Sequence, residues 1–251
     1  MRPILYTPSG RAGEYQDKGY AANIFSGCDH GCRYCYAPAA KWMKGPEGKV
    51  KFHASVTAVP DLFARMSKDC AEKIPDPIFL CFLCDVYPAN HDVHGLTRSI
   101  LKIITDSGNA VNILTKGGTR AVKDFDLLVK DPRNKIGATL TFMDNDLSRK
   151  WEPKAALPDD RLQMLSRAKD AGISTWASIE PVISPKESLR AMYFAAPYVD
   201  EFKIGKWNHD PRAEEIDWGK FYQDAKNLME HLGKKHMFKK DLLEAAGVNL
   251  S

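Results

Sequence analysis

The 251-residue sequence lacks the features that mark several specialised classes of protein. No apolar run approaches the roughly 20 residues that span a bilayer, so no transmembrane helix is expected. The first residues carry no secretory hydrophobic stretch, and a cytoplasmic protein is therefore expected. Repeats, low-complexity tracts and Ser/Gly linkers are missing as well. With 44% hydrophobic and 27% charged residues, the composition is that of an ordinary globular domain.

The sequence has little excess of positive over negative charge and few cysteines. Its net charge is +4 and its pI is about 8.6, below the value of about 9 that is typical of a dedicated nucleic-acid module. The charge therefore permits an anionic partner without requiring one. Six cysteines do not predict a disulfide framework in a reducing compartment. Three of them fall within eight residues, which indicates a metal or cluster site.

Short apolar runs alternate with longer helical patterns along most of the chain. Runs that are apolar on both faces are typical of parallel strands covered by helices. This alternation predicts an α/β fold with a parallel sheet and right-handed crossovers, as one domain over residues 1–251 with its core at about 20–232 and a short C-terminal extension. A doubly wound sheet and a full or partial barrel both satisfy the pattern. The predicted strands are 22–26, 78–83, 110–114, 136–141, 173–179 and 199–204, and the predicted helices are 34–43, 62–71, 96–107, 119–129, 159–171, 186–194 and 218–232.

The most specific motif is a group of three cysteines in the loop after the first predicted strand. Cys28, Cys32 and Cys35 have the spacing C-x3-C-x2-C. Three thiolates on one short loop can bind three irons of a [4Fe–4S] cluster, which leaves the fourth iron open for a substrate or cofactor. Gly27 and Gly31 allow the backbone to bend closely around a bulky cluster.

A structural zinc site is the alternative for this loop. Zinc in proteins usually has four ligands, often arranged as paired C-x2-C knuckles. His30, Cys81 or Cys84 can supply the fourth ligand in this sequence. The unequal spacing of the three cysteines and their place after a strand favour the cluster.

The C-x3-C-x2-C motif, with an aromatic residue directly before its last cysteine, resembles the radical S-adenosylmethionine superfamily. Further segments after successive strands resemble the branch that contains spore photoproduct lyase. The resemblance implies a partial (β/α)6 TIM-like barrel, a [4Fe–4S] cluster held by Cys28, Cys32 and Cys35, and S-adenosylmethionine bound at its open iron. It also implies a 5′-deoxyadenosyl radical that abstracts hydrogen from the substrate, and an electron donor of the flavodoxin or ferredoxin type. The resembling segments are 82–88, 114–116, 151–153, 160–162, 178–182, 203–209 and 237–242.

Several polar side chains at the predicted strand ends become candidates for contact with S-adenosylmethionine. Lys116 is expected to pair with the carboxylate of the cofactor, unless it is a solvated surface lysine. Thr141 and Ser178 are expected to bond its amino acid or ribose part, with a structural hydroxyl as the alternative. Glu180 is expected to bind a ribose hydroxyl or the substrate, and Asp85 to lie near the methionine amino group. The predicted cofactor-binding residues are Tyr34, Tyr36, Asp85, Lys116, Thr141, Ser178 and Glu180.

Cys84 is the candidate catalytic thiol. In spore photoproduct lyase, a cysteine near this position returns a hydrogen atom to the substrate radical, and the resemblance implies the same role here. The alternative is a small buried hydrophobic residue, the usual state of a free cysteine. Cys81 lies three residues earlier on the predicted strand, so it is expected to face the other way.

Two further polar positions allow a structural or a functional role. Glu152 precedes a proline after the fourth predicted strand, where it can touch a polar substrate group or cap a turn. The basic residues at 234–236 and 239–240 can contact phosphates or form a solvated face.

Radical initiation does not define a substrate. A nucleic-acid base is the first hypothesis, through repair of a thymine lesion or rearrangement of a modified thymine, with DNA or a nucleotide as partner. A radical enzyme for a small metabolite or peptide is the second. A non-catalytic zinc or iron–sulfur protein is the third.

Overall fold

The computed structural model describes residues 2–15, 19–40, 43 and 45–249. Its main layer is a parallel sheet of seven strands in the order β1-β4-β5-β6-β7-β8-β9. This order follows the chain, as expected for a barrel that winds in one direction, and the α/β class with a partial TIM-like barrel is confirmed. The strands are β1 (Ala21–Ala22), β4 (Ile78–Leu80), β5 (Val111–Thr115), β6 (Lys135–Thr139), β7 (Ser174–Val182), β8 (Glu201–Lys206) and β9 (Lys235–Phe238).

Two details of the sheet differ from the prediction. The first predicted strand, 22–26, is divided: β1 joins the main sheet, whereas β2 (Phe25–Ser26) pairs antiparallel with β3 (Thr57–Ala58) in a separate ribbon. The seventh strand, β9, is not among the predicted strands and continues the sheet beside β8. The C-terminal extension is therefore part of the main sheet.

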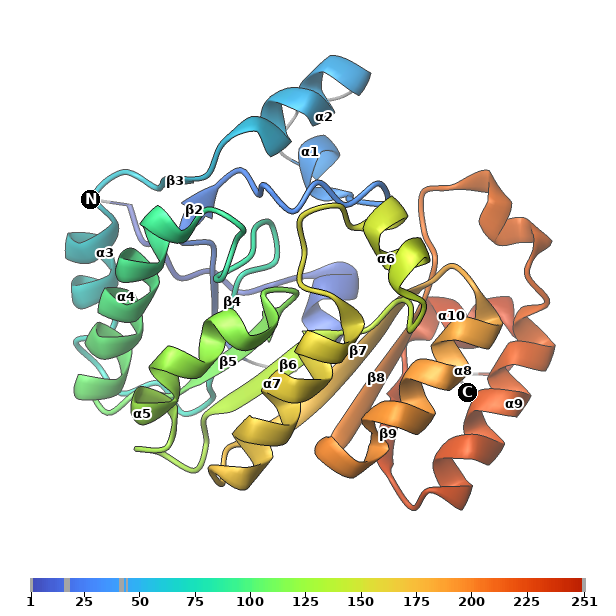
Figure 1. Ribbon diagram of the computed structural model, residues 1–251. Coiled ribbons are helices and arrows are strands. Elements are labelled where there is room, and N and C mark those ends of the chain that lie inside the picture. Colours follow the sequence, from blue (N-terminus) through green and yellow to red (C-terminus); the bar gives the residue numbers. More distant parts are fainter. Residues whose placement is uncertain (1, 16–18, 41–42, 44, 250–251) are drawn as a thin grey trace.

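Helices cover the sheet on one side, as Figure 1 shows for those that follow β4, β6 and β8 along the chain. The expected helix at 119–129 is instead a 3-10 helix followed by a short α-helix, and 34–43 contributes only α1, with residues 41–42 outside the described part. The α-helices are α1 (Ala37–Ala40), α2 (Gly45–Ala54), α3 (Leu62–Asp69), α4 (His94–Asp106), α5 (Phe125–Leu128), α6 (Asn145–Trp151), α7 (Pro158–Asp170), α8 (Pro185–Ala195), α9 (Trp218–His231) and α10 (Lys240–Ala245). The 3-10 helices are η1 (Gly10–Tyr15), η2 (His91–Val93), η3 (Gly118–Asp124), η4 (Ala196–Tyr198) and η5 (Pro211–Glu215).

Helix α7 shows how local sequence sets the ends of an element. Pro158 stands in the first turn, where its missing N–H costs no hydrogen bond, and Asp159 and Asp160 complement the positive end of the helix dipole. The helix ends before Gly172, whose φ of +78° suits a left-handed C-terminal turn.

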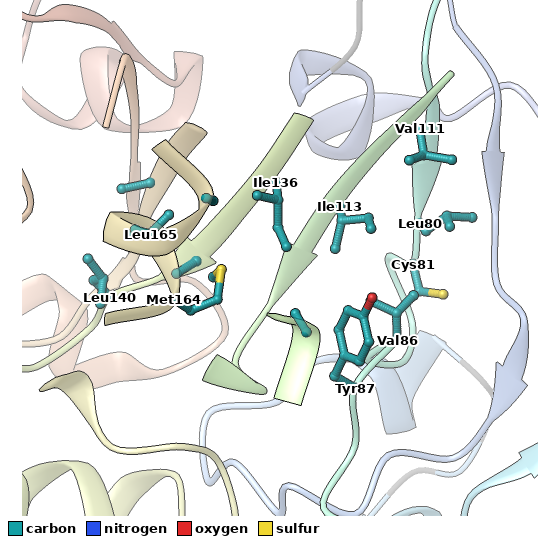
Figure 2. Close-up of a cluster of buried hydrophobic side chains, with 14 of the residues drawn as sticks. Leu80, Cys81, Val86, Tyr87, Val111, Ile113, Ile136, Leu140, Met164 and Leu165 are labelled. Atoms are coloured by element: carbon teal, nitrogen blue, oxygen red, sulfur yellow. The ribbon is translucent and has the colours of Figure 1, made fainter. Parts of the chain in front are cut away.

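The core lies between the helices and the outer face of the sheet. Figure 2 shows Met164 and Leu165 of α7 close to Ile136 of β6, and all three are fully buried. Burial of such a side chain contributes about 1.5–3 kcal/mol. Within the described residues, no helix is long and apolar enough to cross a membrane.

Candidate active site

A cavity of about 380 Å³ opens at the carboxyl ends of the strands. Its wall draws on the loop after β1, on β4 to β8 and on both terminal segments. This is the end of a parallel barrel at which active sites are found. Every predicted site residue except Thr141 lines it: Cys28, Cys32, Tyr34, Cys35, Tyr36, Cys84, Asp85, Lys116, Ser178 and Glu180.

The cysteine loop is held against α2 by close backbone contacts. The Cys28 amide donates to the carbonyl oxygen of Phe52 at 3.3 Å. Gly27 has a φ of +82°, and a Cβ there would stand 2.1 Å from the carbonyl oxygen of Ser55. Only glycine fits this position, which brings the loop close to the end of α2.

The three thiols share one wall of the cavity and lie in a poorly solvated environment. Burial raises the pKa of Cys28 and Cys35, and it raises the pKa of Cys32 to about 12. Thiolates in such a place need a cationic partner, which the irons of a cluster supply when the thiols release their protons. The donor set therefore fits a [4Fe–4S] cluster.

No group of His, Cys, Asp or Glu side chains in residues 2–15, 19–40, 43 and 45–249 converges on a single metal ion. Cluster ligands need not converge in this way, because each cysteine binds a different iron. His53 also lines the cavity, and its Nε2 atom is buried and without a hydrogen-bond partner in the described chain.

Asp85 joins the ends of β4 and β5. Its carboxylate accepts hydrogen bonds from the amides of Tyr87 (2.9 Å) and Lys116 (2.8 Å) and from the hydroxyl of Thr115 (2.6 Å). Burial opposes the charged form, but the neighbouring His30 ring and these hydrogen bonds hold the pKa of Asp85 below its usual value. Asp85 therefore shapes the loops that carry Cys84 and Lys116.

A buried ion pair lies behind the cysteine loop. Arg161 is fully buried and pairs with Glu152, which is 2% exposed and also accepts a hydrogen bond from the Tyr34 hydroxyl. The Thr141 hydroxyl lies 3.3 Å from the same Tyr34 oxygen, so the structure places Thr141 in this network, and Thr139 lines the cavity instead. Glu152 thus holds the aromatic residue between two cysteines rather than capping a turn.

Lys116 stands between this pair and the cavity. Its ammonium lies 5.9 Å from the centre of the Tyr34 ring. Burial opposes its charge, but the Cys32 sulfur and the Glu152 carboxylate raise the pKa of Lys116 above its usual value. Lys116 is therefore a protonated lysine facing the cavity, not a solvated surface residue.

A second charged network lies on β7 and the terminal segments. Glu180 accepts a hydrogen bond from the Tyr15 hydroxyl and pairs with Lys239 at 3.1 Å. Lys239 is 2% exposed and lines the cavity, so the alternative of a solvated face is wrong for this residue. Sequence reasoning missed Tyr15, which no motif marks. It named Lys239 only as part of a basic stretch inside the resembling segment 237–242 and did not place it in the site.

Cys84 lines the cavity together with Cys81. The expectation that they face opposite ways is wrong, because β4 ends at Leu80 and the chain then bends. Burial and a hydrogen bond between the two thiols raise the pKa of Cys84 well above its usual value.

Comparison with known proteins decides the family of this chain. A sequence model of the Radical SAM superfamily matches residues 22–193, a span that contains the cysteine loop and strands β4 to β7. The chain belongs to the radical SAM superfamily. Membership implies a [4Fe–4S] cluster and S-adenosylmethionine as cofactors, and enzymes of the radical SAM superfamily require a reductant.

Curated relatives of this radical SAM protein are distant. Uncharacterized protein MJ0683 of Methanocaldococcus jannaschii is 30% identical over 166 residues, which are 65% of this chain and 60% of that protein. Uncharacterized protein Rv2578c of Mycobacterium tuberculosis is 25% identical over 170 residues, which are 65% of this chain and 49% of that protein. The chain thus spans about half to three-fifths of the length of these relatives.

Solved structures share the fold of this radical SAM protein. A cysteine-to-serine mutant of spore photoproduct lyase has a TM-score of 0.68 at 14% identity, over 95% of this chain and 81% of that one. Streptococcus suis SuiB bound to S-adenosylmethionine has a TM-score of 0.59 at 12% identity, over 92% of this chain and 53% of that one. At these identities the likeness concerns the fold alone.

Proposed function

We propose that this radical SAM enzyme abstracts a hydrogen atom from a nucleic-acid base, either a thymine lesion or a modified thymine. Spore photoproduct lyase, whose structure complexed with dinucleoside spore photoproduct has a TM-score of 0.68 to this chain, shows that a similar fold can bind such a compound. The observation that carries the proposal is the part of the cavity wall formed by Lys206 and Trp207, with a second indole ring and a guanidinium packed behind it.

Behind Trp207, which lines the cavity, the Arg212 guanidinium lies 4.9 Å from the ring centre of Trp207 and 5.2 Å from that of Trp151. Asp210 holds the guanidinium by hydrogen bonds of 2.8 and 2.6 Å. Trp207 also lines the cavity, next to Lys206. Aromatic faces beside cations are what a protein needs to stack a base and hold its phosphate.

The chain holds the cofactors through the groups on the cavity wall. Cys28, Cys32 and Cys35 ligate the cluster, and Lys116 binds the carboxylate of S-adenosylmethionine. Reductive cleavage of bound S-adenosylmethionine supplies a 5′-deoxyadenosyl radical, with the electron coming from a flavodoxin- or ferredoxin-type donor. The remaining predicted cofactor contacts are Tyr34, Tyr36, Asp85, Thr141 and Ser178, with Thr141 acting through Tyr34. Of the two roles expected for Glu180, a ribose hydroxyl or the substrate, we assign it the substrate.

Cys84 is the hydrogen-atom donor in this proposal. Its position on the cavity wall gives it access to a bound substrate. The raised pKa keeps the sulfur protonated, which is the state that donates a hydrogen atom.

The first test asks whether the cofactors bind. Anaerobically reconstituted, dithionite-reduced protein is measured by electron paramagnetic resonance with and without S-adenosylmethionine. We expect a reduced [4Fe–4S] signal that changes when S-adenosylmethionine is added, and no signal after replacement of all three loop cysteines by alanine. Stoichiometric zinc without a cluster signal would instead support a zinc-binding protein.

The second test concerns the substrate class. Formation of 5′-deoxyadenosine is measured with thymidine, with thymine-containing oligonucleotides, and with unrelated metabolites and peptides. We expect stimulation by the thymine compounds and oligonucleotide binding that weakens steeply with salt. Stimulation only by metabolites or peptides would refute the nucleic-acid proposal while leaving the radical chemistry intact.

A further inference from the structure

Three side chains from distant parts of the chain meet on one wall of the cavity. Glu180 comes from β7, Tyr15 from η1, and Lys239 directly follows β9. The Lys239 ammonium lies 3.2 and 3.1 Å from the two oxygens of Glu180 and 4.5 Å from the centre of the Tyr15 ring. The Tyr15 hydroxyl donates to Glu180 and lies 3.0 Å from the Ser178 hydroxyl. The lysine side chain is only 2% exposed, whereas the Glu180 side chain keeps 18% exposure toward the cavity.

The surrounding chain fixes this network in place. A Cβ on Gly205 of β8 would stand 2.5 Å from the Glu180 carboxyl carbon, so the carboxylate lies directly against the glycine backbone. The Lys203 ammonium donates to the Tyr15 carbonyl oxygen at 2.8 Å, and the Lys240 amide donates to Glu14 at 2.7 Å. The two terminal segments are thus tied to the barrel and to each other.

Tyr15 and Lys239 both lie outside residues 22–193, the span that the superfamily shares. Glu180 lies inside that span, so the superfamily model does not account for its two partners, Tyr15 and Lys239. We therefore assign the network to binding of the substrate, which differs between members of the superfamily, rather than to binding of the shared cofactors.

The opposite charges of Glu180 and Lys239 restrict the kind of ligand that can bind beside them. Lys239 and Glu180 together are neutral and present an N–H donor beside a carboxylate acceptor. A carboxylate or phosphate would be repelled by Glu180, and a cation would be repelled by Lys239. A neutral group that carries an N–H next to a C=O can bond both residues at once, and a buried site of this kind discriminates strongly against ligands that leave it unpaired.

We propose that Tyr15, Glu180 and Lys239 form a recognition site for the imide edge of a pyrimidine base, with the ring N–H donating to Glu180 and a ring carbonyl accepting from Lys239. This assignment rests on the proposed function and narrows it to thymine- or uracil-type bases. Cytosine has an acceptor at the ring nitrogen and an amino group beside it, so it presents the wrong pattern. Changes at C5 or C6 leave the imide edge intact, and a ring held by this edge presents C5 and C6 to the opposite part of the cavity.

The test uses the reconstituted holoenzyme with S-adenosylmethionine. Binding of thymidine, N3-methylthymidine and deoxycytidine is measured by calorimetry, together with a single-stranded oligonucleotide that contains one thymine or one N3-methylthymine. We expect N3-methylation to weaken binding by about tenfold to a hundredfold, the usual effect of losing a hydrogen bond to a charged group. The free nucleosides and the oligonucleotides separate a nucleoside substrate from a DNA substrate.

Two variants locate the effect in the network. In Glu180→Gln and Lys239→Met we expect weaker thymidine binding and a reduced preference for thymidine over N3-methylthymidine, with an unchanged cluster spectrum. The matched control is Lys235→Met, an exposed lysine of the same strand β9, which should bind thymidine like the unmodified protein. Glu180→Gln keeps the shape of the side chain, so it should fold like the unmodified protein. The comparison of thymidine with N3-methylthymidine on the unmodified protein tests the site without any substitution.

The outcomes separate the two proposals. Equal binding of thymidine and N3-methylthymidine, or an unchanged preference in both variants, would overturn the recognition site while thymine compounds still stimulate 5′-deoxyadenosine formation. Failure of every nucleoside and oligonucleotide to bind or stimulate would overturn the proposed function and, with it, this assignment.

Discussion

Removal of Arg161 should destabilise the protein more than removal of any exposed charge does. Arg161 is fully buried and donates to the carbonyl oxygens of Ala156 (2.8 Å) and Thr139 (2.9 Å) as well as pairing with Glu152. Arg161→Met leaves a carboxylate that is 2% exposed without its hydrogen-bonded counter-charge, and of the two cations only the Lys116 ammonium remains to oppose the cost of burial. Breaking a buried pair in this way costs about 3–5 kcal/mol of unfolding free energy.

The pH dependence gives this prediction a sign. In the unmodified protein Arg161 and Lys116 outweigh burial and hold the pKa of Glu152 below its reference value of 4.5. The carboxylate therefore contributes stability above pH 4.5 that is lost as the pH falls through the lowered pKa. Without Arg161, only Lys116 and the Tyr34 hydroxyl still oppose burial, so the pKa of Glu152 rises and the ionised carboxylate contributes less stability in the variant than in the unmodified protein. The difference in unfolding free energy between the two proteins should therefore shrink as the pH falls from about 7 toward 4.5 and below, where the carboxylate becomes protonated in both.

The assay is urea unfolding of the cluster-free protein, followed by circular dichroism at several pH values. Arg149→Met is the control, because Arg149 forms an exposed pair with Asp146 and should change stability by less than about 0.5 kcal/mol. The double variant Arg161→Met with Glu152→Leu should recover part of the loss, because no buried charge is left unpaired. A double variant as unstable as the sum of its parts, or a pH-independent loss, would refute the reasoning.

Three further predictions concern the site itself. Gly27→Ala should lower iron incorporation and unfolding free energy, measured by metal analysis and urea unfolding, because its Cβ would stand 2.1 Å from a backbone oxygen; normal iron content would contradict this. Cys84→Ala should still produce 5′-deoxyadenosine but change the distribution of substrate products, as resolved by mass spectrometry, whereas Cys70→Ala, at a buried thiol away from the cavity, should change neither. Gly205→Ala should weaken thymidine binding in calorimetry about tenfold or more, because the added methyl displaces the Glu180 carboxylate, and unchanged affinity would show that this contact is dispensable.

Local patterns in the sequence predicted the cysteine loop and most of the sheet. Cys28, Cys32 and Cys35 lie within eight residues, so their spacing alone brings them together. Strands β4 to β8 are mostly buried along their length, so their prediction tolerates an error of one or two residues at the ends. Lys116 and Ser178 followed from the same logic, because residues at the carboxyl ends of parallel strands meet at one end of a barrel.

The remaining site residues depend on contacts that no local pattern encodes. Strand β9 has only four residues, none of them fully buried, so Lys239 looked like part of a solvated basic stretch. The Glu180 and Lys239 partners are 59 residues apart, and Tyr15 and Glu180 are 165 apart. Charge on a lysine predicts exposure unless its partner is known, since burying an unpaired ammonium is prohibitively costly. The partner can be recognised only once the sheet order places β9 beside β8. The resulting buried pair of Glu180 and Lys239 is the one from which we propose the recognition site.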